Sequence, residues 1–254
     1  MIRKAINRVK EEISAVAFTF SFLSRINFGF FYYKPELFWR SIKYIPIFSF
    51  VSGGIVFLLY YASGKFLPHP MPEFFTIFAQ YILFNYFHFD GLLDFSDAFL
   101  SHKKSREDIL KIMDDTKIGT FAVLVGVIYL LAKIELYKSI LPQNPQIIIF
   151  SFSSGRLGIL VSSFLFPKPA KSEGLGYFFL SAGRKSFIIP SLILFVANTY
   201  FSPYETIFSV FSAVVIGFFS LKRINGLTGD VLGAICEISE IVFLATNFVI
   251  SFSK

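Results

Sequence analysis

Long apolar runs recur along this chain of 254 residues, and polar loops separate them. They predict helices that cross a lipid bilayer at about 45–62, 74–89, 119–137, 147–166, 187–201, 205–221 and 231–251. In lipid, only helices and closed barrels satisfy their own backbone hydrogen bonds, and a helix needs about 20 residues to cross comfortably. Several of these runs are shorter than that. We therefore expect an all-α, polytopic integral membrane helix bundle with about seven transmembrane helices.

The composition also favours a membrane protein. Hydrophobic residues make up 54% of the sequence and charged residues only 16%, against about 45–50% and about 25% in soluble domains. No linker rich in Pro, Gly or Ser divides the runs, so residues 1–254 are expected to form a single membrane-embedded domain. Residues 1–27 mix charged and aromatic side chains, which predicts an N-terminal amphipathic helix at the membrane interface.

The basic residues indicate how the chain is oriented. They punctuate the apolar runs instead of forming one patch, so the net charge of +7 points to the lipid bilayer and not to nucleic acid as a partner. With the N-terminus in the cytoplasm, 19 of the 24 basic residues fall on cytoplasmic segments, three fall on the opposite side and two lie inside helices. The positive-inside rule therefore predicts a multi-pass protein of the cytoplasmic (inner) membrane, with its N-terminus and acidic loops in the cytoplasm.

One acidic segment, residues 88–97 (HFDGLLDFSD), carries the strongest local signal for chemistry. In a helix, offsets of 0, 4 and 7 place Asp90, Asp94 and Asp97 within about 60° on one face. Hard oxygen ligands without a nearby cysteine favour Mg²⁺ or Mn²⁺ over zinc. We therefore predict a Mg²⁺ site at these three carboxylates. The competing interpretation is a solvated loop whose charge is balanced by Lys103, Lys104 and Arg106. His88 is expected either to hydrogen-bond substrate or to pack at the helix end.

Further candidates lie on the same predicted cytoplasmic face. Asp115 is placed to complete the metal site or to orient a nucleophile, and a compatible interpretation is that Asp115 or Thr116 caps the next helix. Lys117 beside it suits a phosphate near a helix start. Glu173 lies in a loop at 167–176 with two prolines and two glycines, and Asp230 follows the flexible turn at 225–229 (NGLTG).

Charged residues inside the predicted membrane helices include Lys133, Arg156, Glu237 and Glu240. A charge at that depth is costly unless it faces protein, a cation or water. Glu240 is therefore expected either to pair with Arg156 or Lys133 or to serve a function directly. Arg156 is expected either to form such a pair or to hold a phosphate oxygen.

Several carboxylates, Mg²⁺ and basic residues at one membrane face favour displacement at phosphorus. No P-loop, G-x-S-x-G, H-E-x-x-H or C-x-x-C motif occurs, which argues against the chemistries that depend on them. A CDP-alcohol phosphotransferase acting on a lipid is an alternative, although the spacing of the acids departs from that pattern. A cation-coupled transporter is a less favoured alternative, because it predicts acids at mid-membrane and an inverted repeat.

Blocks that occur in a fixed order resemble the cobalamin synthase family, the adenosylcobinamide-GDP ribazoletransferases. They are residues 22–26 (FLSRI), 88–97, 113–121 (MDDTKIGTF), 173–176 (EGLG) and 226–230 (GLTGD), the last followed by Glu237 and Glu240. Asn27 and Asp114 stand where the family has a proline and a basic residue. The resemblance covers nearly the whole chain.

The resemblance implies a reaction and its participants. α-Ribazole or its 5′-phosphate displaces GMP from adenosylcobinamide-GDP and yields adenosylcobalamin or its 5′-phosphate, the last steps of nucleotide-loop assembly. The implied Mg²⁺ ligands are Asp90, Asp94 and Asp97, and the implied catalytic residues are Asp115 and Asp94. The implied substrate-binding residues are His88, Lys117, Arg156, Glu173 and Asp230. An open cytoplasmic cleft is expected; a homo-oligomer or association with other enzymes of cobalamin synthesis stays open.

Overall fold

The computed structural model describes residues 2–28, 35–102 and 105–252. Within these ranges the regular structure is helical apart from one isolated parallel β-bridge between Pro169 and Leu227. The helices are α1 (Ile2–Leu23), α2 (Pro35–Ser41), η1 (Ile42–Tyr44), α3 (Ile45–Ser63), α4 (Met71–Gln80), η2 (Tyr81–Asn85), α5 (Tyr86–Leu100), α6 (Arg106–Met113), α7 (Thr120–Ile140), α8 (Ile147–Leu165), α9 (Leu175–Leu180), η3 (Arg184–Phe187), α10 (Ile188–Phe201), α11 (Pro203–Ile224) and α12 (Gly229–Phe252). The predicted all-α fold is confirmed.

Five helical segments of the described chain are long and apolar enough to cross a membrane. They are Glu36–Ser63, Thr120–Ile140, Ile147–Leu165, Pro203–Ile224 and Gly229–Phe252. Each contains or closely matches a predicted span, so these five predictions are confirmed. The predicted span at 187–201 falls on the shorter α10, and the one at 74–89 falls on α4, η2 and the start of α5. These two crossings stay predictions.

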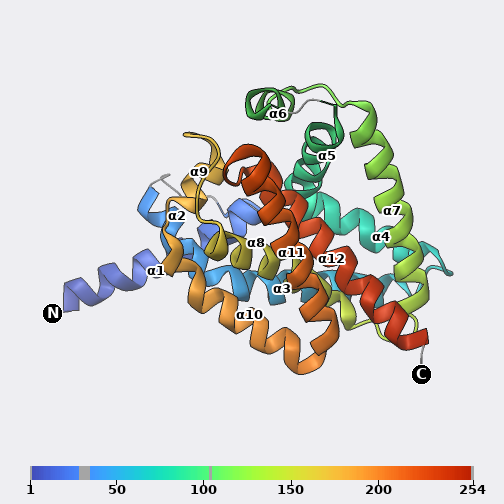
Figure 1. Ribbon diagram of the computed structural model, residues 1–254. Helices are drawn as coiled ribbons and strands as arrows, with labels where there is room; N and C mark the ends of the chain where they lie inside the picture. The colour runs from blue at the N-terminus through green and yellow to red at the C-terminus, as the bar shows by residue number, and fades with distance from the viewer. Residues whose placement is uncertain (1, 29–34, 103–104, 253–254) are drawn as a thin grey trace.

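The last helix, α12, lies at the centre of the bundle and packs along α5, α8 and α11 (Figure 1). Its start, α6 and α9 lie at the same end of the bundle, while its own end lies at the opposite side. The loops predicted to be cytoplasmic therefore gather at one end. That end carries the acidic segment of α5 as well.

Helix α1 reaches out from the bundle at its N-terminal end (Figure 1). Ile6, Val9 and Ile13 are exposed there, whereas Ala15 and Phe18 further along are buried. The predicted N-terminal helix is confirmed, and its second half packs against the protein. The exposed apolar residues on its first half suit a membrane surface, and that placement stays a prediction.

Helices α5 and α12 cross closely because glycines stand at the contact. A Cβ atom on Gly91 would lie 2.9 Å from the carbonyl oxygen of Asp230, and one on Gly233 would lie 2.9 Å from that of His88. Small residues of this kind let membrane helices approach each other. The crossing brings the acidic part of α5 against the start of α12.

We expect Gly91→Ala to lower the melting temperature of the detergent-purified protein. The added methyl group forces the two backbones apart, and overpacking of this kind typically costs about 1–3 kcal/mol. The matched control is Gly54→Ala in α3, where a Cβ would meet no described atom within 4 Å; it is expected to melt at or above the wild-type temperature because alanine favours helix. Circular dichroism melts compare the two, and equal melting temperatures would contradict the close crossing.

Candidate active site

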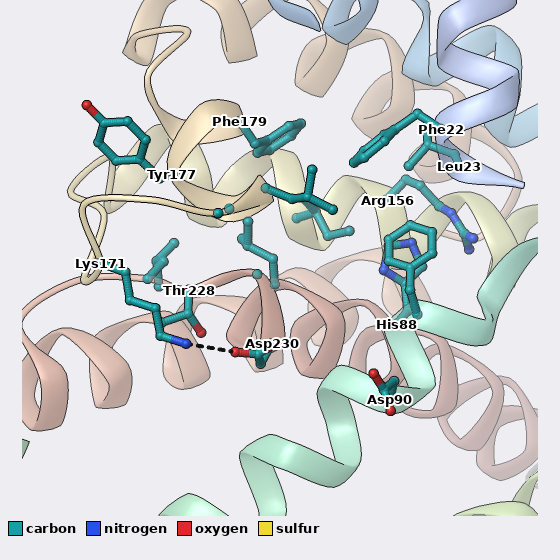
Figure 2. Close-up of a pocket in the computed structure, with 18 of the residues that line it drawn as sticks. Phe22, Leu23, His88, Asp90, Arg156, Lys171, Tyr177, Phe179, Thr228 and Asp230 are labelled. Carbon is teal, nitrogen blue, oxygen red and sulfur yellow. Dashed lines mark ion pairs between the residues drawn. The ribbon is translucent and has the colours of Figure 1, made fainter. Parts of the chain in front are cut away.

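A pocket of about 340 Å³ lies at the loop-bearing end of the bundle. Its lining comes from the end of α1, the start of α3, α5, α8, α9, the loops that precede α9 and α12, and α12 itself. Figure 2 shows how side chains from these distant segments face the same space. Five predicted site residues line it: His88, Asp90, Arg156, Glu173 and Asp230. The tertiary fold thus brings together most of the substrate-binding set.

Carboxylates lie close together where α5 meets α12: Asp90 and Asp230 line the pocket, and Asp94 lies near them but outside the lining. Burial, followed by the charges of Asp90, Asp230 and Asp97, raises the pKa of Asp94 from 3.8 to about 7, while Lys171 partly offsets the effect. Asp94 itself is half-buried and lies one helical turn beyond Asp90. The shift shows that the carboxylates lie close enough to repel one another, as the sequence predicted.

The carboxylate set is chemically suited to a magnesium ion. In the described part of the chain, no group of three or more His, Cys, Asp or Glu side chains forms a ready metal cage. Mg²⁺ at a phosphate substrate usually takes only one or two protein carboxylates, and the substrate and water supply the rest. Asp90 and Asp94, with Asp230 across the helix crossing, fit that mode of binding because they offer hard oxygen ligands in a site with excess negative charge.

Asp97 has a contact that the sequence prediction did not include. One of its carboxylate oxygens accepts the N–H of Gly119 at 2.6 Å and the other accepts the N–H of Ala122 at 2.9 Å. These are unpaired donors at the start of α7, so Asp97 holds that helix end. The N-cap position is Gly119, and the interpretation in which Asp115 or Thr116 caps the helix is wrong. The role of Asp97 as a metal ligand stays a prediction.

Asp115 and Lys117 lie outside the pocket lining. Both are exposed, and the Asp115 carboxylate accepts the backbone N–H of Lys117 at 3.1 Å in a local turn. Their neighbour Asp114 connects the segment to the pocket, because it pairs with Lys171 at 2.6 Å. Lys171 also lies 3.8 Å from Asp230, a contact that is drawn in Figure 2. The sequence predicts that the lysines of the 167–176 loop either contact phosphate or anchor the loop at the membrane face, and Lys171 was not selected among the site residues.

The loops that border the pocket are fastened to each other. Ala170 donates to the carbonyl of Leu227 at 2.8 Å, and Leu227 donates to that of Lys168 at 2.9 Å. Arg106 of α6 donates to the carbonyls of Ile224 and Ala170 at 2.9 and 2.6 Å. Arg106 therefore joins two loops, and the interpretation that it balances the acidic segment is not supported by these contacts. Lys103 and Lys104 lie outside the described residues.

The charges within the membrane helices pair with one another. Glu240 contacts Arg156 at 2.6 Å and Lys133 at 2.9 Å, as one of the two interpretations predicted. The second acid, Glu237, accepts hydrogen bonds from Tyr129 at 2.6 Å, Tyr81 at 2.7 Å and Asn85 at 2.9 Å. Tyr81 and Asn85 lie on η2, a π-helical turn, and such turns are frequent at functional sites. Each charged group in this network has at least one ionic partner of opposite sign.

The fold and the pocket define an all-α membrane protein with a carboxylate-rich cavity at one end of its bundle, an arrangement suited to a phosphate-containing substrate. The model of the family described as cobalamin-5-phosphate synthase matches residues 15–248. The chain therefore belongs to this enzyme family.

The three curated relatives described next have the same name. A protein named adenosylcobinamide-GDP ribazoletransferase from Fervidobacterium nodosum is 34% identical over 245 residues, which cover 93% of this chain and 97% of the relative. Proteins of that name from Thermosipho africanus (34% identical; 85% and 90% covered) and from Clostridium botulinum strain Okra (33% identical; 83% and 87% covered) are similar to it as well. No solved structure matches the chain.

Proposed function

We propose that this enzyme transfers the phosphocobinamide group of adenosylcobinamide-GDP to α-ribazole or its 5′-phosphate. One observation carries the proposal: the blocks that resemble the family converge on a single pocket. Phe22 comes from the first block, Asp90 from the second, Glu173 from the fourth and Asp230 from the fifth, and all four line it. The third block adjoins it through the contact between Asp114 and Lys171.

The bond changes follow from the substrates. A ribose hydroxyl of α-ribazole attacks the phosphorus on the cobinamide side of the diphosphate. A phosphorus–oxygen bond forms, the bond from that phosphorus to the bridging oxygen breaks, and GMP leaves with the bridging oxygen. The hydroxyl proton passes to a base or to water. The product of the phosphorylated acceptor keeps its phosphate at the 5′ position, so the attacking hydroxyl is one of the other hydroxyls of the ribose. The same hydroxyl attacks when the acceptor is α-ribazole itself.

Each group has a proposed role in this reaction. Mg²⁺, when bound, would neutralise the diphosphate charge. Asp90 and Asp94 would hold the ion, with Asp230 opposite them, and Lys171 would contact phosphate oxygens from the loop side. The proposed roles of Asp97 as a third ligand, Asp115 as base and Lys117 as a phosphate contact rest on the sequence resemblance.

We also place the pocket on the cytoplasmic side of the inner membrane. The count of basic residues supports this orientation, because the loops around the pocket belong to the segments that carry most of them. Nucleotide substrates and Mg²⁺ are present in the cytoplasm, which agrees with the same orientation.

The direct test is an assay of GMP release. Purified protein in detergent, supplied with adenosylcobinamide-GDP, α-ribazole and Mg²⁺, is expected to form GMP and adenosylcobalamin in equal amounts. Chelation of the metal with EDTA is expected to stop the reaction, and excess Mg²⁺ to restore it. A parallel arm supplies a CDP-alcohol and a lipid acceptor. Absence of GMP release in the first arm, or CMP release in the second, would contradict the proposal.

A further inference from the structure

The pocket has two chemically different ends. Figure 2 shows Phe22, Leu23, His88 and Arg156 gathered at one end, and Lys171, Thr228 and Asp230 at the other. We call the end with Phe22, Leu23, His88 and Arg156 the aromatic end. Three further residues line the same pocket: Phe87, Ile45 and Leu232. Its members are largely buried, whereas Asp90, Glu173 and Gly174 of the charged side are exposed. A ligand with one flat apolar part and one charged part fits such a division.

Two nitrogen atoms at the aromatic end have no hydrogen-bond partner among the described residues. They are Nε of Arg156 and Nε2 of His88, on side chains that are only 1% and 3% exposed. The remaining Arg156 nitrogens do have partners, since Nη1 bonds to Glu240 and Nη2 to Asn85. Buried polar groups in folded proteins are almost always hydrogen-bonded. Arg156 Nε carries a hydrogen, and His88 Nε2 carries one in one of its two neutral tautomers. Both can therefore donate to an acceptor that the described residues do not provide.

We propose that the aromatic end binds the dimethylbenzimidazole base of α-ribazole, whose unsubstituted ring nitrogen accepts a hydrogen bond from Arg156 Nε or His88 Nε2. The inference rests on the proposed function for the identity of the acceptor substrate. The base is flat and apolar and carries one acceptor nitrogen with no donor. Phe22 and Phe87, whose ring centroids lie 6.0 Å apart, together provide an aromatic surface against which the base packs.

The other parts of the two substrates fit this end poorly. Guanine carries N–H donors on its pairing edge, and these need acceptors when buried. Among the described residues that line the pocket, side-chain oxygens belong to Asp90, Glu173, Tyr177, Thr228 and Asp230. Figure 2 shows Tyr177, Thr228 and Asp230 away from Phe22 and Arg156, so Asp90 below His88 is the labelled side-chain oxygen nearest to the aromatic end. A pocket of 340 Å³ lies at the small end of the about 300–1,000 Å³ range of ligand pockets, so it is too small to enclose a corrin ring.

A base seated at the aromatic end directs its ribose toward the carboxylates. Asp90 lies two residues after His88 on α5, and the pocket continues from there to Asp230 and Lys171. The ribose hydroxyl then lies on the side where the diphosphate is proposed to bind. The aromatic end thus acts as a specificity element for the acceptor, separate from the phosphate contacts.

The first test compares the two substrates in one variant. Phe22→Ala is expected to raise the KM for α-ribazole, and its Kd by isothermal titration calorimetry, about tenfold through lost ring contact. The KM for adenosylcobinamide-GDP is expected to stay within about twofold. The matched control is Phe150→Ala, a half-buried phenylalanine that packs on Phe201 away from the pocket. A rise confined to adenosylcobinamide-GDP would assign the aromatic end to guanine and overturn the inference.

The second test uses the wild-type protein, so it does not depend on a variant that folds. An α-riboside of dimethylindole lacks the acceptor nitrogen and is expected to bind about tenfold more weakly than α-ribazole, the loss of one hydrogen bond. The preference is expected to disappear in His88→Phe or in Arg156→Lys, the latter retaining a cation for Glu240. Equal binding of the two ribosides, or a preference that survives in both variants, would overturn the inference. If α-ribazole binds in this manner but no GMP is released, the proposed function fails while the assignment of the aromatic end remains.

Discussion

Asp94→Asn is expected to reduce the rate of GMP release about 10²–10³-fold, the effect of removing one group that stabilises charge in a transition state. The substitution keeps the size of the side chain and removes only its charge. Asp94 lies where Asp90, Asp97 and Asp230 all act on it, so its loss weakens the proposed Mg²⁺ site at its centre. The measurement is steady-state GMP formation across a range of Mg²⁺ concentrations.

The matched control for this variant is Asp108→Asn. Asp108 lies on α6 at the same end of the bundle and is not among the charges that act on Asp94. Its replacement is expected to leave the rate within about twofold of wild type, since substitutions away from special features have small effects. Equal rates for Asp94→Asn and wild type would contradict the proposed metal site and the function built on it.

Asp94→Asn is also expected to be at least as stable as wild type in metal-free buffer at pH 8. The folded protein holds the pKa of Asp94 at about 7 against an ordinary 3.8, so between these pH values the folded state binds a proton that the unfolded state loses. The wild-type protein therefore loses stability as pH rises through this range. Asparagine removes the penalty, and the difference between the melting temperatures is expected to vanish below pH ~4. A melting temperature well below wild type would assign Asp94 a structural role.

Glu240→Leu is expected to have the largest effect on stability. Glu240 contacts both Arg156 and Lys133, and all three side chains are at most 1% exposed. Removing one member of a buried ionic group costs about 3–5 kcal/mol, a large part of a typical net stability of about 5–15 kcal/mol. We expect poor accumulation in the membrane, or a melting temperature lower by roughly 10 °C or more.

Two further variants separate charge balance from side-chain shape. Glu240→Leu combined with Lys133→Met leaves one cation, Arg156, with one anion, Glu237, and is expected to recover part of the lost stability. Glu135→Leu is the control, because that carboxylate is 68% exposed and pairs with Lys138 on the surface; its loss is expected to cost less than about 1 kcal/mol. If Glu240→Leu has the same melting temperature as Glu135→Leu, the buried ion pairs are not what stabilises the bundle.

The pairing of Glu240 with Arg156 shows what sequence reasoning reached and where it stopped. Charges at bilayer depth need partners. Because few charged residues fall inside the predicted membrane helices, the sequence was enough to name Glu240 and Arg156 as one of the possible pairs. The same reasoning did not reveal that Asn85 of the π-helical turn also donates to Glu240, because a local distortion of the helix decides which way that side chain faces. The unpaired nitrogens of Arg156 and His88 were likewise out of reach.

The contacts of the loops were still harder to predict. Asp97 was selected for its spacing from Asp90 and Asp94, but its oxygens accept backbone N–H groups at the start of α7. Lys171 pairs with Asp114 across 57 positions of the sequence. No periodicity or local spacing carries such information, because each contact depends on how two separate loops are placed by the helices beneath them.

The sequence by itself determined the all-α membrane fold, five of the membrane-spanning segments, the acidic face and the family, because hydropathy, helical spacing and ordered motifs are local properties of the chain. Only the tertiary structure decided which acids face the pocket, which of them hold a helix end instead, and that the pocket has an aromatic end beside its charged one. The physical reason is the close crossing of α5 and α12 at Gly91 and Gly233, together with the loops that meet over it. That geometry places side chains from distant segments around one space.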